Sequence, residues 1–205
     1  MNIPKVQKNE KSNHGNVSFE KSNIKKSVFL VVASLITGVS TAIYWTFAKD
    51  FVSNTGDLSS LTTTIFWILI GLSGIGGGVA GNIIEKLGLV MSYRFAIIVI
   101  FLSITILAFF HSYAILIYIS GLFFGSSYVF FTGVILVWGV RIYPWQSSLG
   151  IGLPFLTLAL GQIIGSAIGG SFIQWTDYGT AFILFGLFGL LAIPIKPKES
   201  NIKSA

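Results

Sequence analysis

The chain has 205 residues, of which 53% are hydrophobic and only 10% are charged, and its formal net charge at pH 7 is +6. Soluble domains carry about 25% charged residues, so this composition excludes an ordinary soluble domain and favours an integral membrane protein. The chain contains no cysteine, which excludes disulfides, thiolate metal sites and cysteine nucleophiles.

The chain opens with a polar, lysine-rich segment, residues 1–26. This segment has too few apolar residues to form a core, and it lacks the short apolar stretch of a cleavable signal peptide. We therefore predict a disordered cytoplasmic segment, followed by a first membrane span that serves as an uncleaved insertion signal.

Six apolar stretches follow this polar segment. A helix needs about 20 apolar residues to cross the hydrocarbon core, and lipid admits only helices or closed barrels. The stretches are too long and too uniformly apolar for barrel strands. We therefore predict an all-α integral membrane protein, with a transmembrane domain over 27–195 and a cytoplasmic tail over 196–205. The predicted membrane helices are 27–48, 61–84, 89–110, 113–137, 147–173 and 179–195.

The basic residues predict how these spans are oriented. With a cytoplasmic N-terminus, every lysine and arginine except Lys49 falls on the cytoplasmic side, as the positive-inside rule requires. We expect a multi-pass protein of the plasma membrane with both termini in the cytoplasm. The positive charge then fits the anionic headgroups of the lipid bilayer rather than nucleic acid. Trp45, Tyr143, Trp145 and Trp175 are expected to be aromatic anchors near the ends of spans.

Several predicted spans carry glycines spaced by four residues, which places them on one helix face. They are Gly74 and Gly78, Gly77 and Gly81, Gly121 and Gly125, and Gly161, Gly165 and Gly169. Small residues let membrane helices approach closely. Two interpretations stay open: these faces pack inside the chain, or they pack against a partner. The dinucleotide-binding pattern that the glycines of the second span also fit requires a preceding strand, so we do not expect a nucleotide.

A short motif lies at the predicted cytoplasmic exit of the second span. Gly81, Glu85, Lys86 and Gly88 spell G-x-x-x-[DE]-[RK]-x-G. The motif resembles the loop signature of the major facilitator superfamily (MFS), in the weaker form found between the eighth and ninth helices. Glu85 stands where aspartate is usual, and the basic residues expected after Gly88 are absent.

The resemblance implies the C-terminal six-helix half of an MFS transporter, built from two inverted three-helix repeats. It implies that the motif acts as a cytoplasmic latch between helices; the alternative is that Glu85 and Lys86 are a solvated pair at the interface that only ends the span. It also implies a partner, which is either an N-terminal six-helix half or a second copy of this chain.

The same resemblance implies that the first helix of each repeat lines a central cavity. Both helices carry polar or small residues at helical spacing. The candidate cavity-lining residues are Thr41, Tyr44, Trp45, Tyr128 and Thr132. Hydroxyl groups and aromatic rings at these positions could hold a small organic solute that moves by alternating access. The alternative is that the hydroxyls serve the backbone or a neighbouring helix. Gln162, deep in the fifth span, is expected to bridge two helices.

The sequence does not favour an enzyme. No histidine lies near a serine within a span, and no cluster of metal ligands is present, so we expect no catalytic residues, no metal and no cofactor. A second transport class stays open, the six-helix substrate-capture subunit of an energy-coupling vitamin importer. The alanines of the first span, Ala33, Ala42 and Ala48, do not have the spacing of its docking face.

Overall fold

The computed structural model describes residues 21–55 and 59–197. Within these residues helices are the main regular structure, joined by short turns and loops, and no strand is present. The helices are α1 (Lys21–Thr55), α2 (Ser60–Gly77), α3 (Ala80–Leu87), α4 (Leu89–Phe110), α5 (Ala114–Ile142), α6 (Ser147–Trp175) and α7 (Tyr178–Leu190). Five of them, all except α3 and α7, are long and apolar enough to cross a membrane. These five helices indicate a multi-pass membrane protein.

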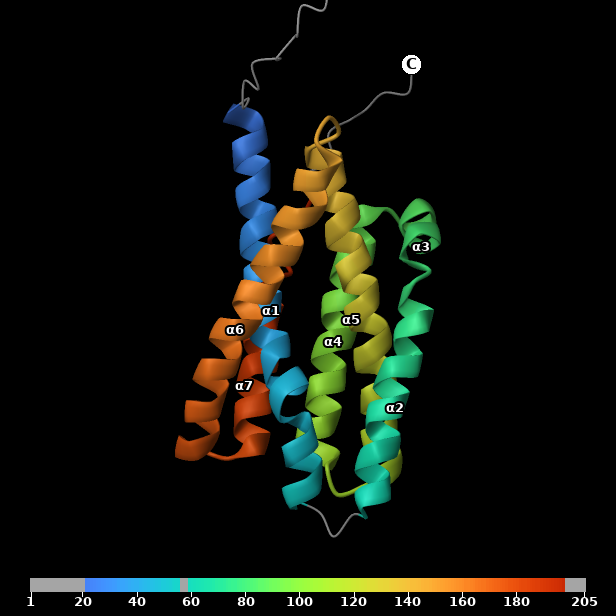
Figure 1. The fold of residues 1–205 in the computed structure, drawn as a ribbon, viewed down its shortest axis with the longest axis vertical. Helices are drawn as coiled ribbons and strands as arrows, with labels where there is room; N and C mark the ends of the chain where they lie inside the picture. Colours follow the sequence, from blue (N-terminus) through green and yellow to red (C-terminus); the bar gives the residue numbers. More distant parts are fainter. Residues whose placement is uncertain (1–20, 56–58, 198–205) are drawn as a thin grey trace, which may run out of the picture.

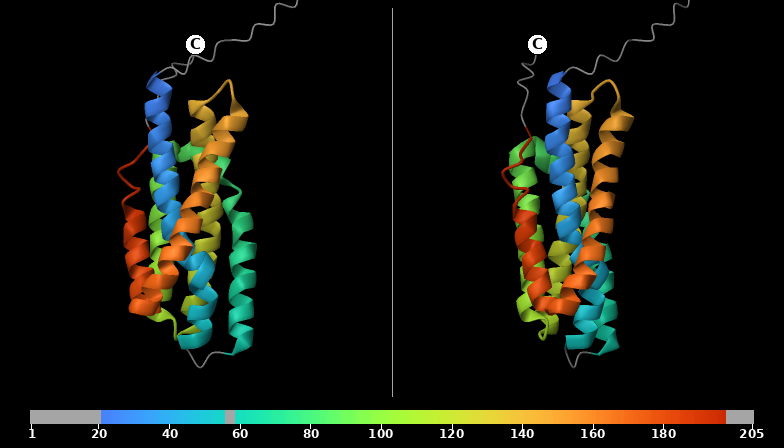
Figure 2. Two further views of the ribbon diagram at one scale, coloured as in Figure 1. Left: turned by 60° about the vertical axis from the view of Figure 1, so that its left-hand side comes forward. Right: turned by 90° about the vertical axis from the view of Figure 1, so that its left-hand side faces the viewer.

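The helices form an elongated bundle of two layers (Figures 1 and 2). α1, α2, α5 and α6 make the front layer in the view of Figure 1, and α4 and α7 lie behind it. Within the front layer α1 packs on α6 and α2 packs on α5, while α4 packs on α5 and α7. The front face of the bundle, formed by α1, α2, α5 and α6, therefore has no further helix of the described chain over it.

The first helix is longer than the predicted span at both ends. Residues 21–26, which we predicted to be disordered, are helical, and the helix continues beyond residue 48 to Thr55. Lys49 and Asp50 are exposed near the end of the helix, where they need not be desolvated. The charged pair that ended the predicted span therefore does not end the helix. Our predictions for residues 1–20 and 198–205 fall outside the described residues.

The predicted second span, 61–84, is not one helix. It breaks at Gly78 and Val79 into α2 and the short α3. Three consecutive glycines, Gly76 to Gly78, run into the break, and each weakens a helix by about 1 kcal/mol relative to alanine. α3 then ends at Gly88, whose φ of 78° is a left-handed conformation that glycine adopts without strain. α4 starts at the next residue.

The predicted sixth span, 179–195, is helical only as α7, and residues 191–195 form turns. Pro194 explains the early end, because proline lacks an N–H group and disfavours a helical residue before it. Tyr93, near the start of α4, fixes these turns by donating a hydrogen bond of 2.8 Å to the carbonyl of Ala192. α7 is thus shorter than α1, α2, α4, α5 and α6.

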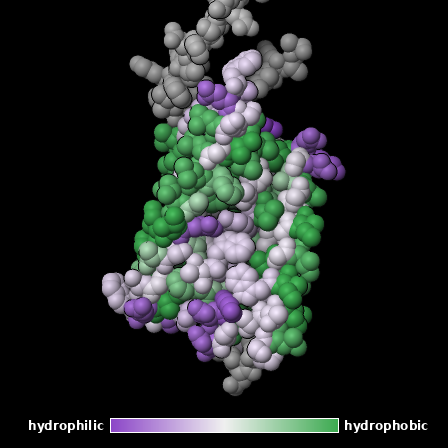
Figure 3. All heavy atoms as spheres, viewed as in Figure 1, coloured by the Kyte–Doolittle hydropathy of each residue, from purple (hydrophilic) through white to green (hydrophobic). Residues whose placement is uncertain are grey.

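Large apolar side chains are exposed around the bundle. Ile75, Phe109 and Ile163 are each more than 60% exposed, and green flanks run along both sides of the front face in Figure 3. A soluble monomer rarely exposes apolar surface on this scale. The surface suits a lipid environment.

Glycines bring the front helices into backbone contact. A Cβ atom added to Gly38 on α1 would collide with the carbonyl oxygen of Leu158 on α6, and one added to Gly125 on α5 would collide with that of Ile70 on α2. Gly161 and Gly165 likewise face the backbone of α1. The glycine faces of α2 and α6 are therefore used inside the chain, where helices need small residues to approach. Of the glycines that the sequence placed on helix faces, Gly81 meets nothing within 4 Å and Gly78 meets only the Ile75 carbonyl of its own turn.

Asp177 caps α7, and this cap makes a testable prediction. Its carboxylate accepts hydrogen bonds from the backbone N–H of Thr180 (2.9 Å) and from the Thr180 hydroxyl (2.6 Å). The side-chain bond from Thr180 is the main cause that lowers the pKa of Asp177 below its ordinary value. Asp177→Ala should cost about 1 kcal/mol of unfolding free energy at pH 7.

The cost of Asp177→Ala should vanish in acid. Because the folded-state pKa is depressed, the stabilisation is present above the unfolded pKa and is lost as the pH falls through the folded pKa. Unfolding in detergent, followed by circular dichroism at pH 7 and in acid, measures the difference. An equal cost at both pH values would contradict the ionised cap.

Candidate solute-binding face

Two of the predicted cavity residues lie inside the bundle. Tyr44 is fully buried, stacks on Phe124 with ring centroids 3.8 Å apart, and shares a hydrogen bond of 2.7 Å with the hydroxyl of Ser120. Thr41 is also fully buried and donates to the carbonyl of Thr37 at 2.8 Å. Both hydroxyl groups thus form hydrogen bonds inside the protein. This agrees with the alternative stated above, in which the hydroxyls bond to the backbone or to a neighbouring helix.

Three aromatic side chains form a half-buried cluster on the front face, which we call the aromatic cluster: Trp45 of α1, Trp67 of α2 and Tyr128 of α5. The ring of Trp45 meets Tyr128 edge-on at 5.2 Å and lies 6.1 Å from Trp67. Phe124 lies beneath the cluster, edge-on to Trp45 at 5.4 Å. The cluster joins three helices across the centre of the layer.

A polar group extends the cluster to the fourth helix of the face. The amide nitrogen of Gln162 on α6 donates a hydrogen bond of 2.9 Å to the hydroxyl of Tyr128. This bond confirms the prediction that Gln162 bridges two helices. Thr132, one turn beyond Tyr128, is half-buried and donates to the Tyr128 carbonyl. The Tyr128 hydroxyl keeps its own hydrogen available for a further acceptor.

The cluster lies at mid-depth. Trp67, Tyr128 and Gln162 stand near the middle of α2, α5 and α6, and Trp45 is in contact with Tyr128. Trp45, which we predicted to anchor the end of a span, lies well before the end of α1, which extends to Thr55; its anchor role stays a prediction. Trp145 and Trp175, by contrast, lie at helix ends and are 96% and 82% exposed. A pale band runs down the middle of the front face in Figure 3, between the green flanks.

The two indole groups have unused hydrogen-bond donors. The ring nitrogens of Trp45 and Trp67 are covered and have no hydrogen-bond partner in the described part of the chain. A buried donor without an acceptor costs about 1 to 3 kcal/mol. Such a cost is commonly borne at places where a ligand or water supplies the acceptor.

A groove leads from one end of the bundle to the cluster. It has a volume of about 450 Å³ and lies between the end of α1 and the start of α2. Its lining is mostly hydroxyl-bearing and includes one ring of the cluster: Lys49, Ser53, Ser60, Thr63, Thr64, Trp67 and Ile68. Trp67 belongs to both the groove and the cluster, so the groove adjoins the aromatic rings directly.

Sequence reasoning missed Trp67. It considered only the first helix of each expected repeat, whereas Trp67 lies on α2. No signal in the sequence distinguished Trp67, because it lies near the start of the predicted span 61–84, where tryptophan is common; the helix break after Gly77 puts it in the middle of α2.

Charged side chains of the described chain lie toward the two ends of the bundle. Lys49, Asp50 and Asp177 are at one end, and Glu85, Lys86, Arg94 and Arg141 are at the other. Among residues 21–55 and 59–197, the middle of the front face therefore carries no ionisable carboxylate or amine. Such groups within a membrane are costly and mark ion or proton pathways.

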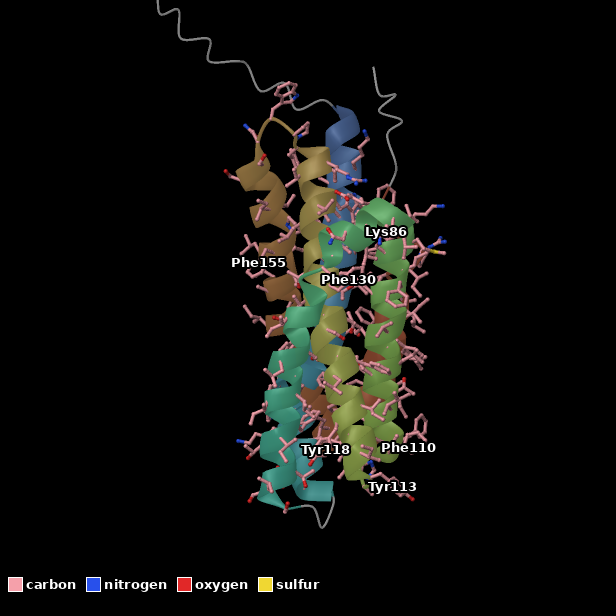
Figure 4. All side chains as sticks on the ribbon, turned by 90° about the vertical axis from the view of Figure 1, so that its right-hand side faces the viewer. Lys86, Phe110, Tyr113, Tyr118, Phe130 and Phe155 are labelled. Atoms are coloured by element: carbon pink, nitrogen blue, oxygen red, sulfur yellow. The ribbon has the colours of Figure 1, made fainter. Side chains whose placement is uncertain are left out.

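The sequence motif of the predicted cytoplasmic loop lies apart from the cluster. Lys86 lies on α3, at the end of the bundle opposite Phe110 and Tyr113 (Figure 4). Glu85 and Lys86 are both exposed, and neither side chain forms a hydrogen bond or ion pair with another described residue. Gly88 supplies the turn into α4. The motif thus ends one helix and starts the next, and its latch role stays a prediction.

No family model matches the chain, and no curated protein matches it.

Proposed function

We propose that this protein is a membrane transporter that moves a small organic solute along the front face of the bundle. One observation carries the proposal: a half-buried aromatic and amide cluster lies at mid-depth on an otherwise apolar bundle. Substrate sites of secondary transporters lie near the bilayer midplane, where polar groups are tolerated if they line a cavity or meet protein. Alternating access would then expose the cluster to each side in turn.

The packing of the helices supports an internal repeat of the MFS type. Gly38 of α1 meets α6 at the Leu158 carbonyl, and Gly125 of α5 meets α2 at the Ile70 carbonyl. Gly165 of α6 then faces Val39 of α1. In the same way, Gly77 of α2 faces Ser126 of α5.

The contacts between α1 and α6 and those between α5 and α2 are made by residues at matching positions. Gly38 and Val39 of α1 match Gly125 and Ser126 of α5, and Ile70 and Gly77 of α2 match Leu158 and Gly165 of α6. In this comparison α1 therefore corresponds to α5, and α2 corresponds to α6. The corresponding helices run in opposite directions through the bundle (Figure 1). Such an arrangement is expected of two inverted three-helix repeats, and it favours one six-helix half of an MFS-like fold.

The front face also requires cover within the membrane. Trp45, Trp67, Tyr128 and Gln162 carry polar atoms that lipid chains cannot satisfy. A second six-helix unit, supplied by another polypeptide region or by a second copy of the chain, would enclose the face as the other wall of a water-filled path. Plasma-membrane insertion with both termini in the cytoplasm completes the proposal.

The proposal is tested by cysteine accessibility, for which this cysteine-free chain is suited without further change. Gln162→Cys and Tyr128→Cys in native membranes should react with a charged, membrane-impermeant maleimide. Ile163→Cys is the matched control, because Ile163 has the same depth on α6 but is a 67% exposed apolar side chain on the outer surface. We expect the thiols of Gln162→Cys and Tyr128→Cys to react with the maleimide at least about tenfold faster than that of Ile163→Cys, because only hydrated thiols ionise readily.

Equal and slow reaction at Gln162→Cys, Tyr128→Cys and Ile163→Cys would contradict a hydrated path. Reaction of all three with a membrane-permeant maleimide after denaturation confirms that each thiol is present. Retained Trp fluorescence and unfolding midpoints show whether each variant is folded.

A further inference from the structure

We propose that the solute is an uncharged, hydroxyl-bearing ring compound, such as a glycoside, which lies against Trp45, Trp67 and Tyr128. This inference rests on the proposed transport function and specifies the chemical class of its substrate.

The charge of the solute follows from the groups that surround the cluster. The neighbouring polar groups that the structure describes are two indole N–H groups, one phenol and one amide, all uncharged. The one charged side chain that lines the groove is Lys49, and it is not among the groups that contact the aromatic cluster. A charged solute at mid-depth would have no counter-charge, and an unpaired buried charge is far more costly than an unpaired dipole.

The rings determine the shape that fits. Half-buried indole and phenol rings offer flat apolar faces with polar edges. A sugar ring has apolar C–H faces and hydroxyl groups at its rim, so it can stack on such faces while its oxygens accept hydrogen bonds. The unpartnered donors on Trp45 and Trp67 and the remaining hydrogen of Tyr128 supply those bonds once the rings part to admit the solute.

The groove supplies hydrogen-bond acceptors, which the indole groups of the cluster lack. The hydroxyl hydrogens of Ser53 and Thr64 are donated to the carbonyls of Lys49 and Ser60, at 2.9 and 3.0 Å. Their oxygen lone pairs stay available as acceptors. A solute in the groove therefore meets hydroxyl oxygens that can accept and, at Lys49, an ammonium that can donate, before it reaches the indole donors of the cluster. Hydroxyl groups both donate and accept, so they satisfy each set in turn.

The experiment uses a reporter thiol beside the cluster. Thr46→Cys is suited to this, because Thr46 is exposed next to Trp45 and its hydroxyl lies 2.8 Å from that of Ser166 on α6. The rate of maleimide modification is measured in membranes with and without added probe. The probes are the 4-nitrophenyl β-glucoside and β-galactoside, which are uncharged, and the 4-nitrophenyl β-glucuronide, which differs from the glucoside by one carboxylate.

We expect either uncharged glycoside, at about ten times its dissociation constant, to slow modification about tenfold. The glucuronide should leave the rate unchanged, and Trp67→Ala in the same background should abolish protection. Equal or better protection by the glucuronide would overturn the inference that the solute is uncharged. A thiol that reacts readily but is protected by no glycoside would overturn the glycoside class while leaving the transport path intact. An unreactive thiol at Thr46→Cys would instead contradict the proposed path itself, and the inference with it.

Discussion

Gly125→Leu is expected to be among the most destabilising single substitutions in the bundle. A Cβ atom at this position would overlap the Ile70 carbonyl and the Ser73 hydroxyl on α2. The backbone carbonyl cannot rotate away, so the two helices would have to separate along their contact. Overpacking typically costs about 1 to 3 kcal/mol, and we expect the upper end or beyond here because the obstacle is backbone.

Gly71→Leu is the matched control for this prediction. Gly71 lies on α2, one residue from Ile70, but an added Cβ there would meet nothing within 4 Å. The midpoint of unfolding in a titration with denaturing detergent should fall sharply for Gly125→Leu and stay near that of the unchanged protein for Gly71→Leu. Equal midpoints for the two variants would mean that α2 and α5 do not cross at Gly125.

The sequence predicts where the membrane helices lie better than it predicts where a helix breaks. Hydropathy locates α4 almost to the residue, because Gly88 and the polar turn after Phe110 bound it on both sides. It merges α2 and α3, because Val79 and Ala80 keep the stretch apolar across the break. Hydropathy measures compatibility with lipid, and a glycine-rich break can be as apolar as a helix.

The candidate site was predictable in part. Trp45 and Tyr128 lie in the half-buried cluster of the front face and Thr132 is half-buried one turn from Tyr128, but Thr41 and Tyr44 are fully buried in the bundle. The residues at the front face and the buried residues both have helical spacing in the sequence. Spacing along one helix does not determine which neighbouring helix those residues face. The direction depends on contacts such as those at Gly38 and Gly125, which arise only when the helices meet.

Tyr44→Ala is the second large effect that we expect. The ring of Tyr44 is fully buried and stacked on Phe124, with Phe66 and Phe182 at centroid distances of 6.0 and 6.1 Å. Removal of the ring leaves a cavity among three aromatic neighbours, and such truncations cost about 3 to 5 kcal/mol. The midpoint of thermal unfolding in mild detergent should fall accordingly.

Tyr44→Phe separates the ring from its hydroxyl. Ser120 already donates its hydrogen to the Ser103 carbonyl at 2.8 Å, so the hydrogen shared with Tyr44 is the one on the phenol. The phenylalanine variant therefore removes a donor and leaves no buried hydrogen unpaired, and we expect a loss of no more than about 1 kcal/mol. Because Tyr44 lies inside the bundle, the variant should also leave maleimide modification of a Gln162→Cys thiol unchanged. A marked change in that rate would place the Tyr44 hydroxyl on the solute path after all, as the sequence first suggested.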